Sequence, residues 1–95
     1  MGIPVTVRVL LANPTAPSPE GERALQHARA AARRFGDAAE VQPVALDDPA
    51  VRMLSIGVEP TVLVGDLAIA VGIAPPAGHL VRAIERALAK EEKHD

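Results

Sequence analysis

One stretch in the second half of the chain decides its fold: Ile56-Gly57-Val58-Glu59-Pro60-Thr61-Val62-Leu63-Val64-Gly65-Asp66, followed by a second apolar run that ends at Gly72. This order of residues predicts the end of a helix, a proline turn, and then two strands, Thr61–Val64 and Leu67–Val71. The strands are separated only by Gly65 and Asp66. A two-residue link that contains glycine is typical of a tight antiparallel hairpin.

The chain upstream of this stretch begins with a predicted strand and a predicted helix. Residues 5–11 alternate at first and are then continuously apolar, which is typical of a strand whose far end is buried on both faces. After a proline-rich loop, Ser18 suits the N-cap of a helix and Pro19 suits its first position. We expect this helix to run to about Phe35 and to stop at Gly36.

A second strand and a short helix are predicted next. Residues 41–46 favour a strand, and Pro43 places it at a sheet edge or a strand end because proline cannot donate to the ladder. Asp48 is expected to cap a short helix that has Pro49 at its first position and ends at Gly57. The apolar residues of this helix, which we interpret as core, are Val51, Met53, Leu54 and Ile56.

A last helix is predicted after Pro75-Pro76, and residues 91–95 are expected to form a charged, frayed tail. Its expected buried face consists of Leu80, Val81, Ile84, Ala87 and Leu88. The predicted element order is therefore βαβαββα. With 95 residues and no linker-like segment, the chain is expected to form a single domain over residues 1–95.

Composition excludes several classes of function. The chain has no cysteine, so disulfides, thiolate nucleophiles and cysteine-bound zinc are excluded. A net charge of −2 and a single aromatic residue, Phe35, argue against binding to nucleic acid. The apolar run 61–74 is too short to span a membrane, for which about 20 residues are needed. No signal peptide is visible, so we expect a cytoplasmic protein.

No cofactor or metal motif is present either. The glycines match no phosphate-binding loop. The three histidines, His27, His79 and His94, share no metal-ligand spacing and are interpreted as surface residues. The arginines of the first helix are interpreted as solvated charge, with a basic patch for an acidic partner as the alternative.

The stretch 57–66, with Gly72 and Leu80 at suitable distances after it, resembles the thioredoxin fold in its small, glutaredoxin-like form. The resemblance covers almost the whole chain. It implies an α/β fold with a four-stranded mixed sheet and helices on both faces. It also implies a cis peptide bond before Pro60.

The redox site of this family is a Cys-Pro-x-Cys stretch at the start of the first helix. The corresponding residues here are Ser18-Pro19-Glu20-Gly21, which keep the proline and lack both cysteines. Thiol–disulfide exchange requires a thiolate, which neither serine nor glycine can provide. Dithiol oxidoreductase activity is therefore excluded, whatever the fold.

The resemblance also implies a binding groove beside Pro60. The groove would lie between Ser18-Pro19-Glu20-Gly21 and Val58-Glu59-Pro60-Thr61. Glu59 departs from the family, in which the position before the cis proline is often Thr, Val or Ile. A carboxylate there would disfavour acidic ligands such as glutathione, while the backbone of Glu59 could still pair with an extended peptide.

These observations favour a redox-inactive, thioredoxin-like module for protein binding or assembly. One alternative is an enzyme, or a small-molecule-binding protein, that uses Glu59 or Ser18 without thiol chemistry; another is a structural subunit that only oligomerises. Ser18 is more simply interpreted as a helix cap than as a nucleophile. The strand Leu67–Val71 lacks the charges that protect sheet edges, which indicates pairing with a second copy or with a protein partner.

Overall fold

The computed structural model describes residues 3–53 and 57–92, and these form an α/β fold with a mixed sheet. The elements are β1 (Val5–Leu11), α1 (Pro19–Arg33), a 3-10 turn (Gly36–Ala38), β2 (Ala39–Ala45), α2 (Pro49–Arg52), β3 (Thr61–Val64), β4 (Leu67–Val71) and α3 (Ala77–Glu92). Apart from the short 3-10 turn, the order of these elements is the predicted βαβαββα.

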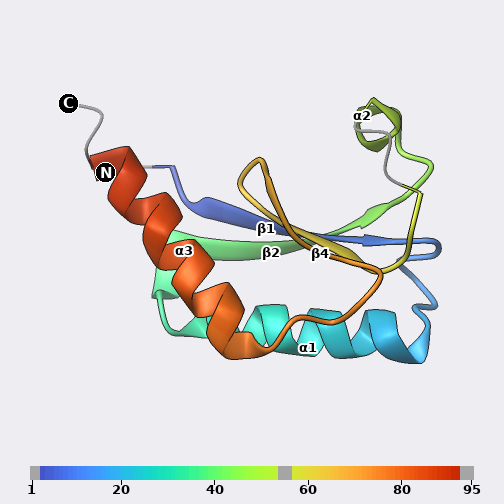
Figure 1. The fold of residues 1–95 in the computed structure, drawn as a ribbon, viewed down its shortest axis with the longest axis horizontal. Coiled ribbons are helices and arrows are strands. Elements are labelled where there is room, and N and C mark those ends of the chain that lie inside the picture. Colours follow the sequence, from blue (N-terminus) through green and yellow to red (C-terminus); the bar gives the residue numbers. More distant parts are fainter. Residues whose placement is uncertain (1–2, 54–56, 93–95) are drawn as a thin grey trace.

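The sheet has four strands in the order β2-β1-β3-β4 (Figure 1). β1 pairs in parallel with β2 and antiparallel with β3, and β3 pairs antiparallel with β4. The β3–β4 hairpin turns at Gly65, whose φ of 61° lies in the left-handed region that favours glycine. Both hairpin strands have the bounds expected from the sequence, and β4 lies at an edge, as expected.

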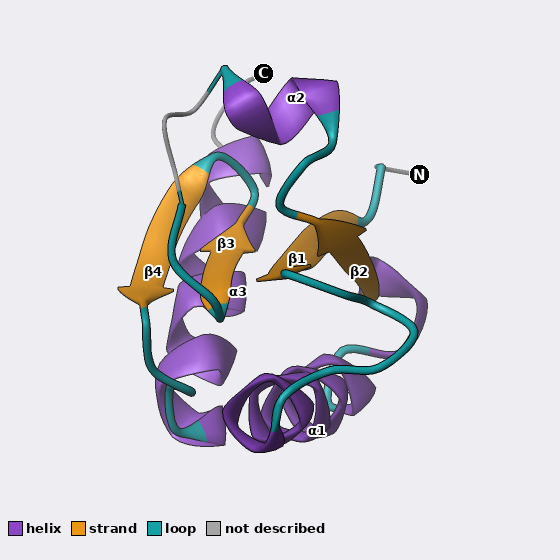
Figure 2. Cartoon of the chain, turned by 90° about the vertical axis from the view of Figure 1, so that its right-hand side faces the viewer, coloured by secondary structure: helices purple, strands orange, loops and turns teal. Residues whose placement is uncertain are grey.

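Helices lie on both faces of the sheet, with α1 and α3 on one face and α2 on the other (Figure 2). The larger core lies beneath α1 and α3, and Val7, Val9 and Leu11 of β1 belong to it. A smaller cluster on the opposite face joins Leu10 and Leu63 to Val51 of α2. β1 therefore contributes side chains to both faces, which explains why its end is continuously apolar.

α1 begins as predicted and ends slightly earlier. Ser18 is its N-cap and Pro19 its first residue. The helix ends at Arg33 rather than near Phe35, and Gly36 then adopts a φ of 55° at the start of the 3-10 turn. The helical residues buried against the sheet include small alanines: Ala24, Ala28, Ala31 and Ala32. Small side chains let the helix axis approach the strands closely.

β2 begins at Ala39, two residues before the expected position, because Ala39 already pairs with Val5 of β1. The strand lies at the outer edge of the sheet, and Pro43 is exposed there. An edge strand tolerates a residue without an N–H group, so the position of Pro43 follows from its chemistry as predicted.

α2 is capped by Asp48, whose carboxylate accepts the N–H of Ala50 at 2.9 Å. The interpretation of Met53 as a core residue is wrong, because its side chain is 87% exposed. The helix ends at Arg52, so helical spacing no longer directs Met53 toward the sheet. Leu54 and Ile56, also interpreted as core, lie outside the described residues.

α3 follows Pro75 and Pro76, and its buried face centres on Leu80 and Ile84, as predicted. The helix extends to Glu92, which is two residues into the segment expected to be a frayed tail. Residues 93–95 lie outside the described residues. Within residues 3–53 and 57–92, no helix has both the length and the apolar character needed to cross a bilayer.

Candidate functional site

The predicted site residues lie where the start of α1 approaches the turn before β3. We call residues 18–21 and 58–61 together the Ser18–Glu59 site. Figure 2 looks down α1 from the end at which these residues lie. Two segments that are far apart in the sequence are joined there, since the Ser18 hydroxyl lies 3.3 Å from Glu59 Oε1.

The Ser18 side chain makes two hydrogen bonds. Its Oγ accepts the N–H of Gly21 at 3.1 Å, which caps α1. Its hydroxyl proton is donated to the carboxylate of Glu59. The cap predicted from the sequence is therefore confirmed, and Glu59 joins it as a second partner.

Gly21 is buried beside this pair, and its missing side chain leaves the space that the pair occupies. A Cβ placed on Gly21 would lie 3.2 Å from Ser18 Oγ, 3.2 Å from Glu59 Oε1 and 2.7 Å from Leu11 Cδ2. The last distance is too short for two carbon atoms. Any larger residue at position 21 would therefore push against both the core and the Ser18–Glu59 contact.

The half-buried carboxylate of Glu59 lies at the N-terminal end of α1, a helix of 15 residues. The first N–H groups of a helix carry a partial positive charge and attract anions. Glu59 therefore provides from within the chain the negative charge that such a helix end would otherwise attract from a ligand. A second anion at the same place would be repelled by the carboxylate.

Glu20 and Pro19 do not take part in this contact. The Oε2 atom of Glu20 accepts the N–H of Ala74 at 3.0 Å, and its Oε1 atom lies 3.3 Å from Arg23. Pro19 is exposed. The carboxylate of Glu20 is thus engaged with the loop between β4 and α3 rather than with Glu59.

His27 also contacts this loop, although nothing in the sequence indicates such a contact. Its Nδ1 atom lies 2.8 Å from the carbonyl oxygen of Pro75, and the ring is half-buried. The interpretation of His27 as a simple surface residue is therefore wrong. The helical position of His27 gave no signal of this contact, because the partner lies 48 residues away.

The turn before β3 is fixed by its own hydrogen bonds. The buried Thr61 donates its hydroxyl to the carbonyl of Val58 at 2.7 Å. The N–H of Gly72 bonds to the carbonyl of Pro60, also at 2.7 Å, and the Glu59–Pro60 peptide is cis, as expected. Val58 is 48% exposed. Within the described residues, neither the N–H nor the carbonyl of Glu59 has a hydrogen-bond partner.

The contact between Ser18 and Glu59 is better suited to positioning than to nucleophilic catalysis. A serine hydroxyl needs an adjacent base to become reactive, and that base is usually itself oriented by a third group. Of the two histidines in the described part of the chain, His27 is engaged with Pro75 and His79 makes no hydrogen bond to this pair. Within the same residues, no group of three His, Asp or Glu side chains could hold a metal ion.

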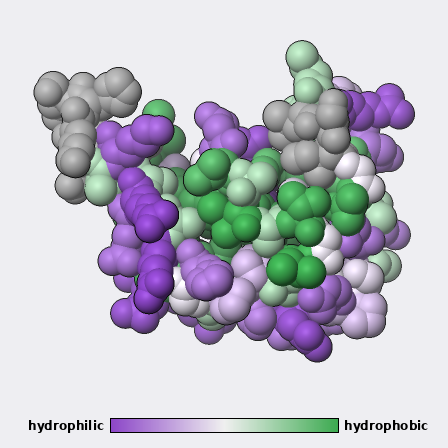
Figure 3. All heavy atoms as spheres, viewed as in Figure 1, coloured by the Kyte–Doolittle hydropathy of each residue, from purple (hydrophilic) through white to green (hydrophobic). Residues whose placement is uncertain are grey.

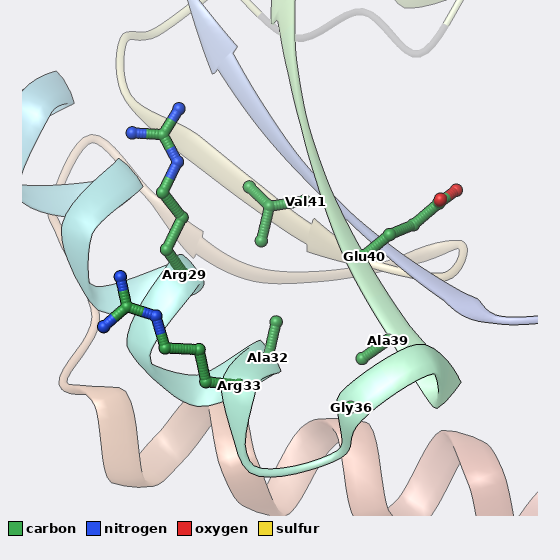
Figure 4. Close-up of a pocket in the computed structure, with 7 residues that line it drawn as sticks. All are labelled: Arg29, Ala32, Arg33, Gly36, Ala39, Glu40 and Val41. Carbon is green, nitrogen blue, oxygen red and sulfur yellow. The ribbon is translucent and has the colours of Figure 1, made fainter.

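A hollow with a volume of about 360 Å³ lies between the end of α1 and the start of β2. It is shown in Figure 4, where the guanidinium groups of Arg29 and Arg33 extend from α1 and the carboxylate of Glu40 points away from them. Both arginines are exposed. They are positively charged and make no ion pair with another described residue, so the basic patch considered from the sequence remains an alternative binding surface.

Comparisons with known proteins show similarity in fold only. No family model matches the sequence, and no curated protein matches it. A solved structure described as "Structure of a malarial protein" superimposes with a TM-score of 0.64 and 18% sequence identity. The match covers 90% of this chain and 98% of that chain. At this identity the likeness establishes a shared architecture, and it leaves the function of this chain to be argued from its own residues.

Proposed function

We propose that this chain is a thioredoxin-like domain without thiol chemistry, which binds an extended segment of a protein partner at the Ser18–Glu59 site. The proposal has two parts. The first is the thioredoxin-like class, and the second is the use of the site for binding rather than for redox exchange.

The class is supported by the arrangement of the sheet together with the resemblance of residues 57–66. A parallel β1–α1–β2 unit is followed by an antiparallel hairpin and a covering helix. The start of α1, where the family has its cysteines, faces the turn before β3. A chain without cysteine cannot exchange disulfides, so this arrangement would have to serve another use, and binding is the use that we propose.

The observation that carries the binding role is the contact between Ser18 and Glu59. It holds the Glu59 side chain against the start of α1, and the neighbouring Val58 is half-exposed. Within the described residues, the backbone N–H and carbonyl of Glu59 have no hydrogen-bond partner. An extended peptide could therefore form backbone hydrogen bonds with them, as a neighbouring strand does in a sheet.

The charge of Glu59 also sets the chemistry of the partner. A carboxylate beside the binding backbone repels acidic side chains and attracts basic ones. We therefore expect an extended segment with lysine or arginine close to the residue that pairs with Glu59. Electrostatic complementarity of this kind contributes mainly to specificity and to the rate of association.

Selection from a phage-displayed library of linear peptides tests this directly. Among the selected peptides, those that bind this site should be rich in lysine or arginine. Their affinity should fall about tenfold, corresponding to about 1.4 kcal/mol, on Glu59→Gln. The matched control is Glu85→Gln, because Glu85 is an exposed glutamate on α3 and its replacement makes the same change in charge.

The location of binding is checked by NMR. Addition of a selected peptide should shift the backbone amides of residues 18–21 and 58–61 more than those of α3. If no basic peptide is selected, or if the basic peptides bind Glu59→Gln as tightly as the unmodified chain or shift amides elsewhere, the Ser18–Glu59 site is not a binding site for them.

A further inference from the structure

The outer edge of the sheet at β4 is apolar, and residues 3–53 and 57–92 provide no strand beside it. The strand order leaves one side of β4 unpaired. Leu67 is 67% exposed and Val71 is 55% exposed, and no residue of β4 carries a charge. Figure 3 shows apolar side chains gathered on the face where Figure 1 places the β3–β4 hairpin, surrounded by hydrophilic ones. Exposed edges of this kind are templates for strand addition.

A groove runs beside this edge, between the hairpin and α3, with a volume of about 640 Å³. The helix α3 packs against α1, β1 and β3, and the groove lies between this helix and the hairpin. We call it the β4 groove. Its apolar lining consists of Val64, Leu67, Ile69, Ala83 and Ala87.

The charges around the β4 groove are unbalanced. Arg86 and Lys90 line it from α3 and are exposed, and neither makes an ion pair with another described residue. Asp66 also lines it, but its carboxylate lies 3.5 Å from Arg8. The groove therefore presents an apolar floor with two cations that have no counter-charge within the described part of the chain.

We propose that an extended segment of a partner protein, rich in apolar and acidic residues, adds to the outer edge of β4. Main-chain hydrogen bonds to β4 would provide affinity, and side chains entering the β4 groove would provide specificity. In this arrangement, apolar side chains of the partner contact Leu67 and Ile69, and acidic side chains of the partner pair with Arg86 and Lys90. This surface is distinct from the Ser18–Glu59 site, which selects for the opposite charge.

An acidic partner fits this surface better than a second copy of the chain does. The β4 strand of a second copy carries no acidic residue, so a two-fold pair of β4 strands would bring no counter-charge from the added strand to Arg86 and Lys90. The bulge in β4, where Ile69 has no partner in β3, also interrupts the regular register that such a pair needs.

Fluorescence anisotropy with two synthetic peptides tests the proposal. One labelled peptide alternates valine with glutamate, and the other alternates valine with lysine. The glutamate peptide should bind, more weakly as salt rises, and the lysine peptide should bind at least about tenfold less tightly. Arg86→Glu and Lys90→Glu should each weaken the glutamate peptide by about tenfold, and Leu67→Ser should weaken it without changing the salt dependence.

Arg52→Glu is the matched control, because it makes the same change in charge at an exposed arginine of α2, on the opposite face of the sheet from α3. Equal losses for Arg52→Glu and Arg86→Glu would overturn the proposal, as would equal affinity for the two peptides or no binding of the glutamate peptide. Sedimentation that shows a dimer abolished by Leu67→Ser would also overturn it, because the occupant of the edge would then be a second copy.

Discussion

The Ser18 hydroxyl and the Glu59 carboxylate are joined by a hydrogen bond of 3.3 Å across 41 residues of sequence. The contact ties the first turn of α1 to the turn before β3. It also places a negative charge at the positive end of the helix. Both the cap and the charge have measurable consequences for stability.

Replacement of Ser18 by Ala should destabilise the fold by about 1 kcal/mol, because Ala cannot accept the Gly21 N–H and a lost N-cap costs about this much. Ser18→Thr should retain most of the stability, since its hydroxyl can make the same bond. Chemical denaturation followed by circular dichroism measures both values. An Ala variant as stable as the unmodified chain would show that the cap contributes nothing.

Glu59→Gln should lower the free energy of unfolding by about 0.5 kcal/mol at low ionic strength. The amide keeps a hydrogen-bond acceptor for Ser18 but loses the charge that interacts with the dipole of α1, an effect of about 0.3–1 kcal/mol. Because salt screens this interaction, the difference should shrink in high salt. Denaturation at two salt concentrations checks this. A loss that is the same at both would mean that charge is not its cause.

Gly21→Ala should destabilise the chain, although Ala normally stabilises a helix by up to about 1 kcal/mol relative to Gly. The new Cβ would lie 2.7 Å from the fully buried Leu11, and overpacking of this kind costs about 1–3 kcal/mol. The steric term is the larger, so we expect a net loss of about 1 kcal/mol.

The control for this change is Gly78→Ala in the first turn of α3. A Cβ at Gly78 would meet no atom within 4 Å. This variant should be at least as stable as the unmodified chain, and thermal unfolding compares the two directly. If Gly21→Ala were also neutral or stabilising, Leu11 would have to move aside without cost, and the tight packing at Gly21 would not matter.

The sequence was sufficient to predict the bounds of those strands that are determined by their own residues and by the turn between them. The β-branched alternation of β1 and the glycine turn at Gly65 defined three strands with their observed bounds. The start of β2 was missed because pairing of Ala39 with Val5 sets it, and that pairing is a tertiary contact. Met53 was wrongly predicted to be buried. It lies beyond the end of α2, so the periodicity of the helix does not direct its side chain toward the sheet.

The site was predictable only in part, for a similar reason. Ser18 and Glu59 were expected to lie together because a resemblance aligned the two segments, and the structure joins them. The same resemblance places Glu20 in this groove, because Glu20 lies in the stretch that corresponds to the family's Cys-Pro-x-Cys. Its carboxylate is instead 3.0 Å from the N–H of Ala74, and no local pattern marks a partner 54 residues away.

The bond between Glu20 and Ala74 can be separated from the general effect of acidic residues at a helix start. Glu20 and Glu22 both lie in the first turn of α1, so both interact favourably with its dipole. Within the described residues, only Glu20 also accepts a backbone N–H from the loop before α3. Glu20→Ala should therefore cost about 1 kcal/mol more than Glu22→Ala, the increment typical of a hydrogen bond to a partly exposed group.

Amide hydrogen exchange provides the local measurement. In Glu20→Ala, the Ala74 amide should exchange about tenfold faster. Amides in the interior of α1 should exchange faster only by the factor that the loss of global stability predicts. In Glu22→Ala, the Ala74 amide should keep its protection relative to the rest of the chain. Equal effects of the two substitutions on Ala74 would mean that the loop is held by its packing, including the contact of His27 with Pro75, and not by Glu20.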